Sequence, residues 1–186
     1  MWLVAFSKGA SEVRLLMDRL AERSDSEKRV KGWINICGIL NGTPLANRKL
    51  GNVFSRGLHA VLYTLLGISY KGLTELATDH PYWQKPLDLP DDVELINIVG
   101  TPLQSHLQPY LMSRARRLES CGPNDGVIVL RNTIPDIGKT YPVWGADHFF
   151  RQAGISNLLV KLFNYITNEN SSAINHTNNT IRSHYV

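Results

Sequence analysis

The chain opens on five consecutive apolar residues that lead directly into a helical pattern. The stretch WLVAF, at 2–6, has no polar alternation, which is typical of a strand buried on both faces of a parallel sheet. From Ala10 onward the apolar positions fall largely on one helical stripe, with charged residues on the other side. A buried strand followed at once by an amphipathic helix predicts a strand–turn–helix unit, with Ser7 at its corner.

The same alternation continues along the chain. Further strands or strand-like segments are expected at 30–38, 93–100, 127–130 and 139–145. Helical periodicity is expected at 54–66, 109–120 and 149–166. Strands separated by helices predict an α/β fold with a mostly parallel sheet flanked by helices, and 186 residues allow one domain with a sizeable core. We expect a polar, disordered tail at 167–186, which is rich in Asn, Ser and Thr.

Composition narrows the classes of function. The net charge of +4 comes from scattered residues, and the basic clusters lack interleaved aromatic residues and zinc-ligand spacing, so no nucleic-acid partner is expected. No apolar run is long enough for a transmembrane helix, and the N-terminus lacks the pattern of a signal peptide, which favours a cytoplasmic location. Cys37 and Cys121 have no metal-ligand spacing, and Cys37 lies in an apolar run where we expect a core residue.

Ser7 lies in AFSKG, which is one substitution away from the G-x-S-x-G nucleophile elbow. In that motif a buried strand turns abruptly into a helix and exposes a serine hydroxyl above the sheet. Ala5 and Gly9 supply the small residues that a close passage of strand and helix at the turn requires. The helix N-terminus would aim backbone N–H groups at a developing oxyanion, and the N–H after the nucleophile belongs to Lys8. The alternative is that Ser7 is only the N-cap of a helix that follows a core strand.

A serine nucleophile needs a base to take its proton and a carboxylate to orient that base. Asp125 lies in the Gly-bounded turn of GPNDGVIVL. His148 lies in WGADHFF, in a turn after the last strand-like segment and at the start of the final helix. Asp125 is alternatively an ordinary turn residue before Gly126. Other carboxylates and imidazoles compete for the two roles: Asp136, Asp147, His59, His80, His106, His176 and His184.

These stretches resemble the C-terminal half of an α/β-hydrolase, close to the lipase and esterase branch. WINICGILNGTPLA is similar to the sixth strand of that family and its GTP loop, NDGVI to its acid-bearing turn and ADHFF to its histidine turn. The resemblance runs from residue 1 to about residue 165 and is most specific in the order Ser, Asp, His along the chain. It implies that Ser7 is the nucleophile, His148 the general base and acid, and Asp125 the orienting acid.

The resemblance also implies how the chain is organised. Residues 1–166 would form a partial α/β-hydrolase domain, with a helical cap or lid inserted at about 39–92. In the family the elbow follows the fifth strand of the sheet, so the chain is expected to be a fragment that lacks the preceding strands and the second oxyanion donor. We expect such a fragment to be inactive alone. It would also expose WLVAF as an apolar sheet edge open to self-association.

The function that the resemblance implies is hydrolysis of a carboxylic ester, from a small molecule or a lipid, through an acyl-serine intermediate. No metal and no organic cofactor is predicted. Two alternatives stay open. One is a degenerate hydrolase relic that serves as a binding or structural module, and the other is an acyltransferase that uses the same triad.

Overall fold

A computed structural model of the chain describes residues 1–22, 30–47 and 75–166. The chain divides into two compact units, Met1–Phe149 and Phe150–Val186. The helix predicted at 54–66 and the tail predicted at 167–186 lie outside the described residues.

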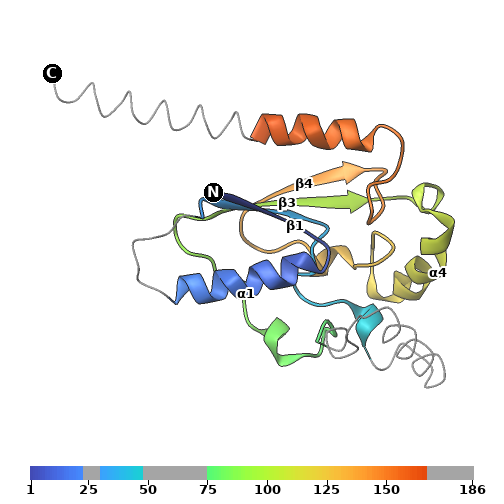
Figure 1. Cartoon of the computed structure of the whole chain (residues 1–186). Helices are drawn as coiled ribbons and strands as arrows, with labels where there is room; N and C mark the ends of the chain where they lie inside the picture. Colours follow the sequence, from blue (N-terminus) through green and yellow to red (C-terminus); the bar gives the residue numbers. More distant parts are fainter. Residues whose placement is uncertain (23–29, 48–74, 167–186) are drawn as a thin grey trace, which may run out of the picture. The chain divides into compact units, whose positions relative to one another are not determined.

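A parallel sheet forms the centre of the first unit (Figure 1). Its strands are β1 (Trp2–Phe6), β2 (Gly32–Ile36), β3 (Glu94–Thr101) and β4 (Lys139–Trp144). They lie in the order β1-β2-β3-β4, and each neighbouring pair is parallel. The prediction of a mostly parallel α/β sheet is therefore confirmed, and the carboxyl ends of all four strands meet at one edge of the sheet.

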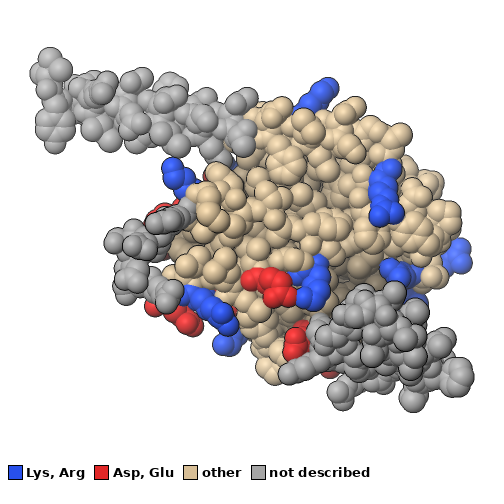
Figure 2. Space-filling model, in the orientation of Figure 1, with Lys and Arg blue, Asp and Glu red and all other residues tan. Residues whose placement is uncertain are grey.

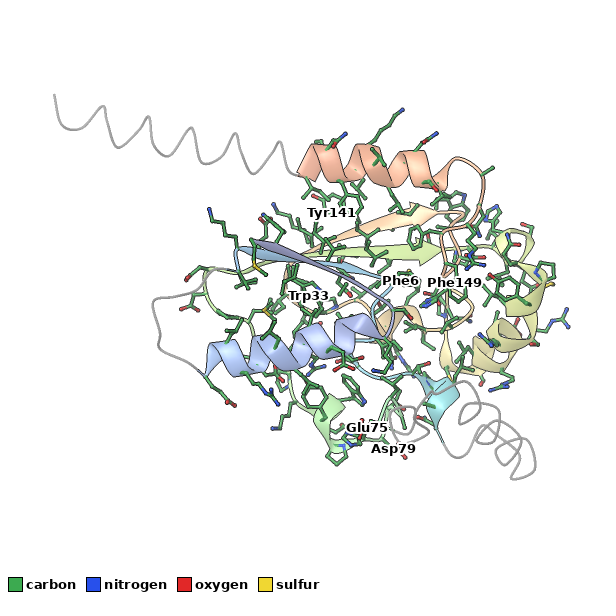
Figure 3. The ribbon with its side chains drawn as sticks, viewed as in Figure 1. Phe6, Trp33, Glu75, Asp79, Tyr141 and Phe149 are labelled. Atoms are coloured by element: carbon green, nitrogen blue, oxygen red, sulfur yellow. The ribbon has the colours of Figure 1, made fainter. Side chains whose placement is uncertain are left out.

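Among the described residues of this unit, two α-helices connect strands of the sheet. The first, α1 (Gly9–Ala21), follows β1 and packs its buried Ala10 and Met17 into a core with Trp33 of β2. Figure 3 shows Trp33 between the sheet and α1. The second, α4 (Pro109–Leu118), lies beyond the carboxyl end of β3 and continues into a short 3-10 turn at Glu119–Cys121. Both predicted helices are confirmed. Other 3-10 turns of the described residues lie at Pro44–Ala46, Pro81–Gln84, Gln104–His106 and Leu130–Asn132.

The segment 127–130, which we expected to be strand-like, is not a strand. Its only ladder contact among the described residues is an isolated bridge between Asn124 and Val129. The backbone N–H groups of Val127 and Ile128 donate instead to the side-chain carboxylate of Asp125. Because these donors are used within the turn, an apolar run that would suit a strand folds as a loop around the carboxylate.

The edge strand β1 is buried on one face only, which corrects the expectation of burial on both faces. Leu3 and Ala5 pack into the core with α1, whereas the side chains on the opposite face are exposed, 61% for Val4 and 41% for Phe6. On the face shown in Figure 2, charged side chains follow α1 and the surface over β1 is uncharged. The edge of the described sheet therefore presents apolar side chains, as we expected.

The second unit contains a helix at 155–166, which begins later than the predicted start at residue 149. Phe150 and Gly154 have positive φ angles of 55° and 82°, which an α-helix does not accommodate. His148 consequently lies in a loop and not at the start of a helix, contrary to the prediction. None of the described helices has the length and apolar character needed to cross a membrane.

Candidate active site

Ser7 occupies a strained turn at the carboxyl end of β1. Its φ of 52° is uncommon for a residue with a side chain and persists only where the surroundings hold it. The Ser7 N–H donates to the Ile36 carbonyl at 3.1 Å, and the Ser7 carbonyl accepts from Ile39 and Ala10, each at 3.1 Å. These bonds to the end of β2 and the first turn of α1 fix the position of the serine hydroxyl.

The close passage at this turn involves Gly38 and Ala10, not Gly9. A Cβ placed on Gly9 would meet no described heavy atom within 4 Å, so the expectation that Gly9 must be small for steric reasons is wrong. A Cβ on Gly38 would instead overlap the Asn35 side chain and the methyl group of Ala10. The loop after β2 thus comes so close to α1 that only glycine fits at position 38.

The structure brings together the three residues that the sequence singled out. Ser7 Oγ lies 2.8 Å from Nε2 of His148, and Nδ1 of His148 lies 2.8 Å from Oδ2 of Asp125. His148 and Asp125 are buried, at 1% and 0% exposure. A serine hydroxyl, an imidazole and a carboxylate therefore form one hydrogen-bonded chain that starts at the carboxyl end of β1.

The turn around Asp125 holds its carboxylate in place. Oδ1 accepts the N–H groups of Val127 and Ile128 at 2.9 and 2.7 Å, which leaves Oδ2 to face the imidazole. The Asp125 backbone carbonyl also accepts from the His148 N–H at 2.9 Å. Gly126, with a φ of 97°, takes the left-handed conformation that this tight turn requires. Both the main chain and the side chain of Asp125 thus orient His148.

The competing carboxylates have other positions. Asp147 is buried, but its oxygens accept from the backbone N–H groups of Phe149 and Gln108, so it serves the loop and not the imidazole. Asp136 is an exposed residue.

The competing histidines do not reach Ser7 either. His80 accepts the Tyr82 N–H within its own turn, and His106 accepts the Leu103 N–H. The remaining alternatives, His59, His176 and His184, lie outside the described residues.

Lys8 is the N-cap residue of α1, with helical φ and ψ of −57° and −32°. Its side chain points along the helix surface, where Nζ pairs with Glu12 at 2.5 Å, and both groups are exposed. The Lys8 side chain is thus paired with Glu12, and the expected oxyanion donor is the Lys8 backbone N–H. The first N–H groups of a helix have no intrahelical partner and carry partial positive charge, which suits an anion.

Aromatic rings that the sequence analysis did not single out surround the imidazole. The ring centroids of Phe6 and Phe149 lie 5.4 and 5.0 Å from that of His148, and Phe149 meets it edge to face. Figure 3 shows Phe6 and Phe149 side by side. Tyr110 of α4 extends the group, 6.1 Å from Phe149. The sequence offers one signal for these rings: Phe6 directly precedes Ser7, and Phe149 directly follows His148.

Cys37 is a buried residue, as predicted, but it also lies beside the polar chain. Its Sγ is part of a group with Asp125 and His148 whose ligand-type atoms all lie within 4.8 Å of one another. Sulfur, oxygen and nitrogen donors at this spacing could hold a zinc-like ion. The Asp125–His148 hydrogen bond already occupies two of the three groups, however, so the arrangement fits a hydrogen-bonded cluster better than a metal centre.

The parallel sheet flanked by helices, with Ser7 at the sharp turn after β1, is part of an α/β-hydrolase fold. Solved structures of lipases and esterases match the chain. A metagenomic carboxyl esterase matches with a TM-score of 0.62 at 20% identity, over 80% of this chain and 45% of its own. The mature form of a lipase from Bacillus licheniformis matches with a TM-score of 0.61 at 19% identity, over 89% and 64%.

The lipase of Staphylococcus hyicus has the same fold, with a TM-score of 0.59 at 12% identity over 92% of this chain and 70% of its own. The chain thus spans 45% and 64% of the esterase and the Bacillus lipase. No protein-family model matches the sequence, and no curated protein is significantly similar to it. The expected resemblance to the C-terminal part of α/β-hydrolases is confirmed at the level of the fold.

Proposed function

We propose that the chain carries the reacting groups of a serine hydrolase that cleaves a carboxylic ester, from a small molecule or a lipid. The observation that carries the proposal is the continuous hydrogen-bonded chain from Ser7 Oγ through His148 to Asp125. This hydrogen-bonded chain lies at the carboxyl ends of the parallel strands, where α/β proteins bind their ligands. The fold shared with carboxyl esterases and lipases supports the same class of reaction.

In the proposed reaction His148 Nε2 takes the Ser7 proton as Oγ attacks the ester carbonyl carbon. The tetrahedral intermediate collapses with cleavage of the bond to the alcohol oxygen, and His148 returns the proton to the leaving alcohol. Water, activated by the same imidazole, then hydrolyses the acyl-serine. Asp125 holds the Nδ1–H of His148, which keeps Nε2 facing Ser7 and stabilises the imidazolium form.

The oxyanion would accept a hydrogen bond from the backbone N–H of Lys8 at the N-terminus of α1. Loss of one oxyanion donor costs a serine protease roughly 10²–10³ in kcat, so a second donor matters for turnover. The reaction of Ser7 with an activated phosphorus centre depends less on the binding of acyl and alcohol groups than ester turnover does. Covalent labelling of Ser7 is therefore a more direct test than ester turnover.

The test is reaction of the purified full chain with a fluorophosphonate, followed by peptide mass spectrometry. Ser7 Oγ displaces fluoride from phosphorus, and the Ser7 proton passes to His148. We expect one adduct per chain on Ser7, no adduct in Ser7→Ala and an unchanged adduct in Ser120→Ala, since Ser120 is an exposed serine in the turn after α4. A folded chain whose Ser7 stays unmodified would contradict the proposal.

The two alternative functions correspond to distinct results. A folded but unreactive Ser7 would favour a non-catalytic relic or binding module. Labelling of Ser7, with acyl groups transferred to an added alcohol or thiol in preference to water, would favour an acyltransferase. Release of free acid in the presence of these acceptors would favour the hydrolase.

A further inference from the structure

The loop after β2 is hydrogen-bonded to the first turn of α1 through both backbone groups of Ile39. The hydroxyl of Ser11, a buried residue of α1, donates to the Ile39 carbonyl at 3.1 Å. The Ile39 N–H donates to the Ser7 carbonyl, also at 3.1 Å. Ile39 is itself buried, so a backbone group that loses its partner here is not readily hydrated. Ser11 therefore holds Ile39, and Ile39 holds the turn that contains Ser7.

The Ser7 carbonyl and the Lys8 N–H belong to one peptide group. A trans peptide is planar, and its C=O and N–H point in opposite directions. The Ser7 carbonyl accepts from Ile39 and from Ala10, each at 3.1 Å. The donors that hold this carbonyl thus also set the direction of the Lys8 N–H, which is the expected oxyanion donor.

The turn at Ser7 needs this support from outside the helix. The positive φ of Ser7, 52°, is a conformation that persists only where the surroundings impose it. Lys8, the N-cap residue of α1, makes no side-chain cap hydrogen bond, so the first turn lacks a common source of stability. The bond from Ile39 joins this turn to the loop after β2, which gives it a second attachment.

We propose that Ser11 is a positioning residue for the reaction, because its hydroxyl fixes the Ile39 peptide that in turn fixes the Ser7 carbonyl and the direction of the Lys8 N–H. This inference rests on the proposed function, since it assigns Ser11 an effect on the oxyanion donor of the same site. The Ser11 side chain touches neither the Ser7 hydroxyl nor a substrate in this scheme and acts only through Ile39.

Loss of the hydroxyl has a consequence that differs from a loss of stability. The buried Ile39 carbonyl would lose the Ser11 donor, and movement of Ile39 toward a new partner would let the Ser7 carbonyl turn. The Lys8 N–H would turn with it and stabilise the oxyanion less well. His148 and Asp125 keep their own hydrogen bonds, so the pH dependence of the reaction would not move.

The experiment measures fluorophosphonate labelling of Ser7 in the full chain at a series of reagent concentrations and pH values. It separates the limiting rate from the half-saturating concentration and gives the pH midpoint. For Ser11→Ala we expect the limiting rate to fall roughly tenfold, less than the 10²–10³ that loss of a whole oxyanion donor costs. The half-saturating concentration and the pH midpoint should stay at their wild-type values.

Two variants are the matched controls. Ser11→Thr keeps a hydroxyl donor at the same position, and Met17→Leu changes a buried residue of α1 that packs into the core with Trp33. Both should label at the wild-type limiting rate. Thermal unfolding establishes which chains are folded, and rates are compared only among those. If Ser11→Ala does not fold, Ser11→Cys, which offers only a weak donor, replaces it under the same criteria.

Several results would overturn the inference while the proposed function stands. They are a wild-type limiting rate in Ser11→Ala, an equal fall in Ser11→Thr, and an equal fall in Met17→Leu, which would trace the effect to general loosening of α1. A pH midpoint that moves in Ser11→Ala would also overturn it, because the effect would then lie at His148. A folded wild-type chain that does not label at all would instead contradict the proposed function, and the inference would fall with it.

Discussion

Ser7 and His148 are 141 positions apart in the sequence, and their Oγ and Nε2 atoms lie 2.8 Å apart. The sheet creates this proximity, because β1 and β4 are parallel and end at the same edge. Ser7 follows β1 directly, and His148 follows β4 after a short loop. The short distance between Ser7 and His148 also depends on the turn at Asp125, because the Asp125 backbone carbonyl accepts the His148 N–H.

Asp125→Asn tests the orienting acid. An asparagine preserves the shape of the side chain and a carbonyl oxygen for the Val127 and Ile128 N–H groups, but its amide cannot hold the Nδ1–H of His148. We expect Ser7 labelling to fall by roughly 10⁴, as kcat does in a serine protease with the equivalent change. Asp136→Asn, at an exposed carboxylate, is the control and should leave the rate unchanged. A wild-type rate in Asp125→Asn would exclude this role.

Gly38→Ala tests the close approach behind Ser7. The added methyl group would overlap Asn35 and Ala10, and overpacking of this kind costs about 1–3 kcal/mol. Gly9→Ala is the matched control, because its methyl group meets no described atom and alanine is the better helix former, by up to about 1 kcal/mol. We expect urea unfolding to show lower stability for the first variant and unchanged or higher stability for the second. Equal stabilities would contradict the assignment.

The strands could be predicted because the sheet is parallel and its interior strands are buried on both faces. The run at 93–100 is mostly apolar, and β3 occupies nearly the same residues. The run at 127–130 is apolar throughout, yet the Asp125 carboxylate takes its backbone donors. Composition does not distinguish these two cases, since the outcome depends on one hydrogen-bonding side chain.

The polar chain could be predicted because its residues lie in turns with recognisable sequences and in a characteristic order. The partners of that chain could not be predicted in the same way. Cys37 resembles any small core residue in an apolar run, and only the folded chain brings its sulfur within 4.8 Å of the Asp125 and His148 side chains. Likewise, the steric need for Gly38 comes from a helix that is distant in sequence.

Arg14→Lys tests a buried cation on α1. The Arg14 guanidinium donates to the Leu40 and Lys85 carbonyls and to Asn41 Oδ1, so it joins α1 to two separate loops. Lysine lacks the planar fork needed to reach all three acceptors, and we expect a loss of about 2 kcal/mol in the free energy of unfolding.

Urea unfolding of Arg14→Lys is compared with that of Arg19→Lys, a change at an exposed position of the same helix. The control should remain within about 0.5 kcal/mol of the wild type. Equal unfolding midpoints for the two variants would show that the contacts of Arg14 add nothing to stability.

Val4→Lys tests association through β1. The strand lies at the edge of the described sheet, and Val4 is 61% exposed, so a second copy of the chain could add a strand there. We expect sedimentation velocity to show concentration-dependent association of the wild type and its loss in Val4→Lys. Leu16→Lys, an exposed apolar position on α1, is the control and should associate as the wild type does. A wild type that stays monomeric at high concentration would exclude this contact.

The alkaline dependence of stability tests the protonated state of Cys37. Its pKa is raised above the ordinary 9.0 by burial and by Asp125, so the folded chain retains a proton that the unfolded chain releases. The resulting stabilisation is complete below pH 9 and is lost as the pH rises toward the folded pKa, with a limiting slope of about 1.4 kcal/mol per pH unit. Between pH 8 and pH 10 we expect the wild type to lose roughly 1 kcal/mol more than Cys37→Ser.

Urea unfolding at a series of pH values measures this difference. Cys121 is present in both chains, so its titration cancels. The series ends at pH 10 because burial and a hydrogen bond to Asp18 raise the pKa of Tyr82 as well, which adds a similar slope at higher pH. Parallel pH profiles for the wild type and Cys37→Ser would mean that the thiol ionises equally in the folded and unfolded states, which would contradict the raised pKa of Cys37.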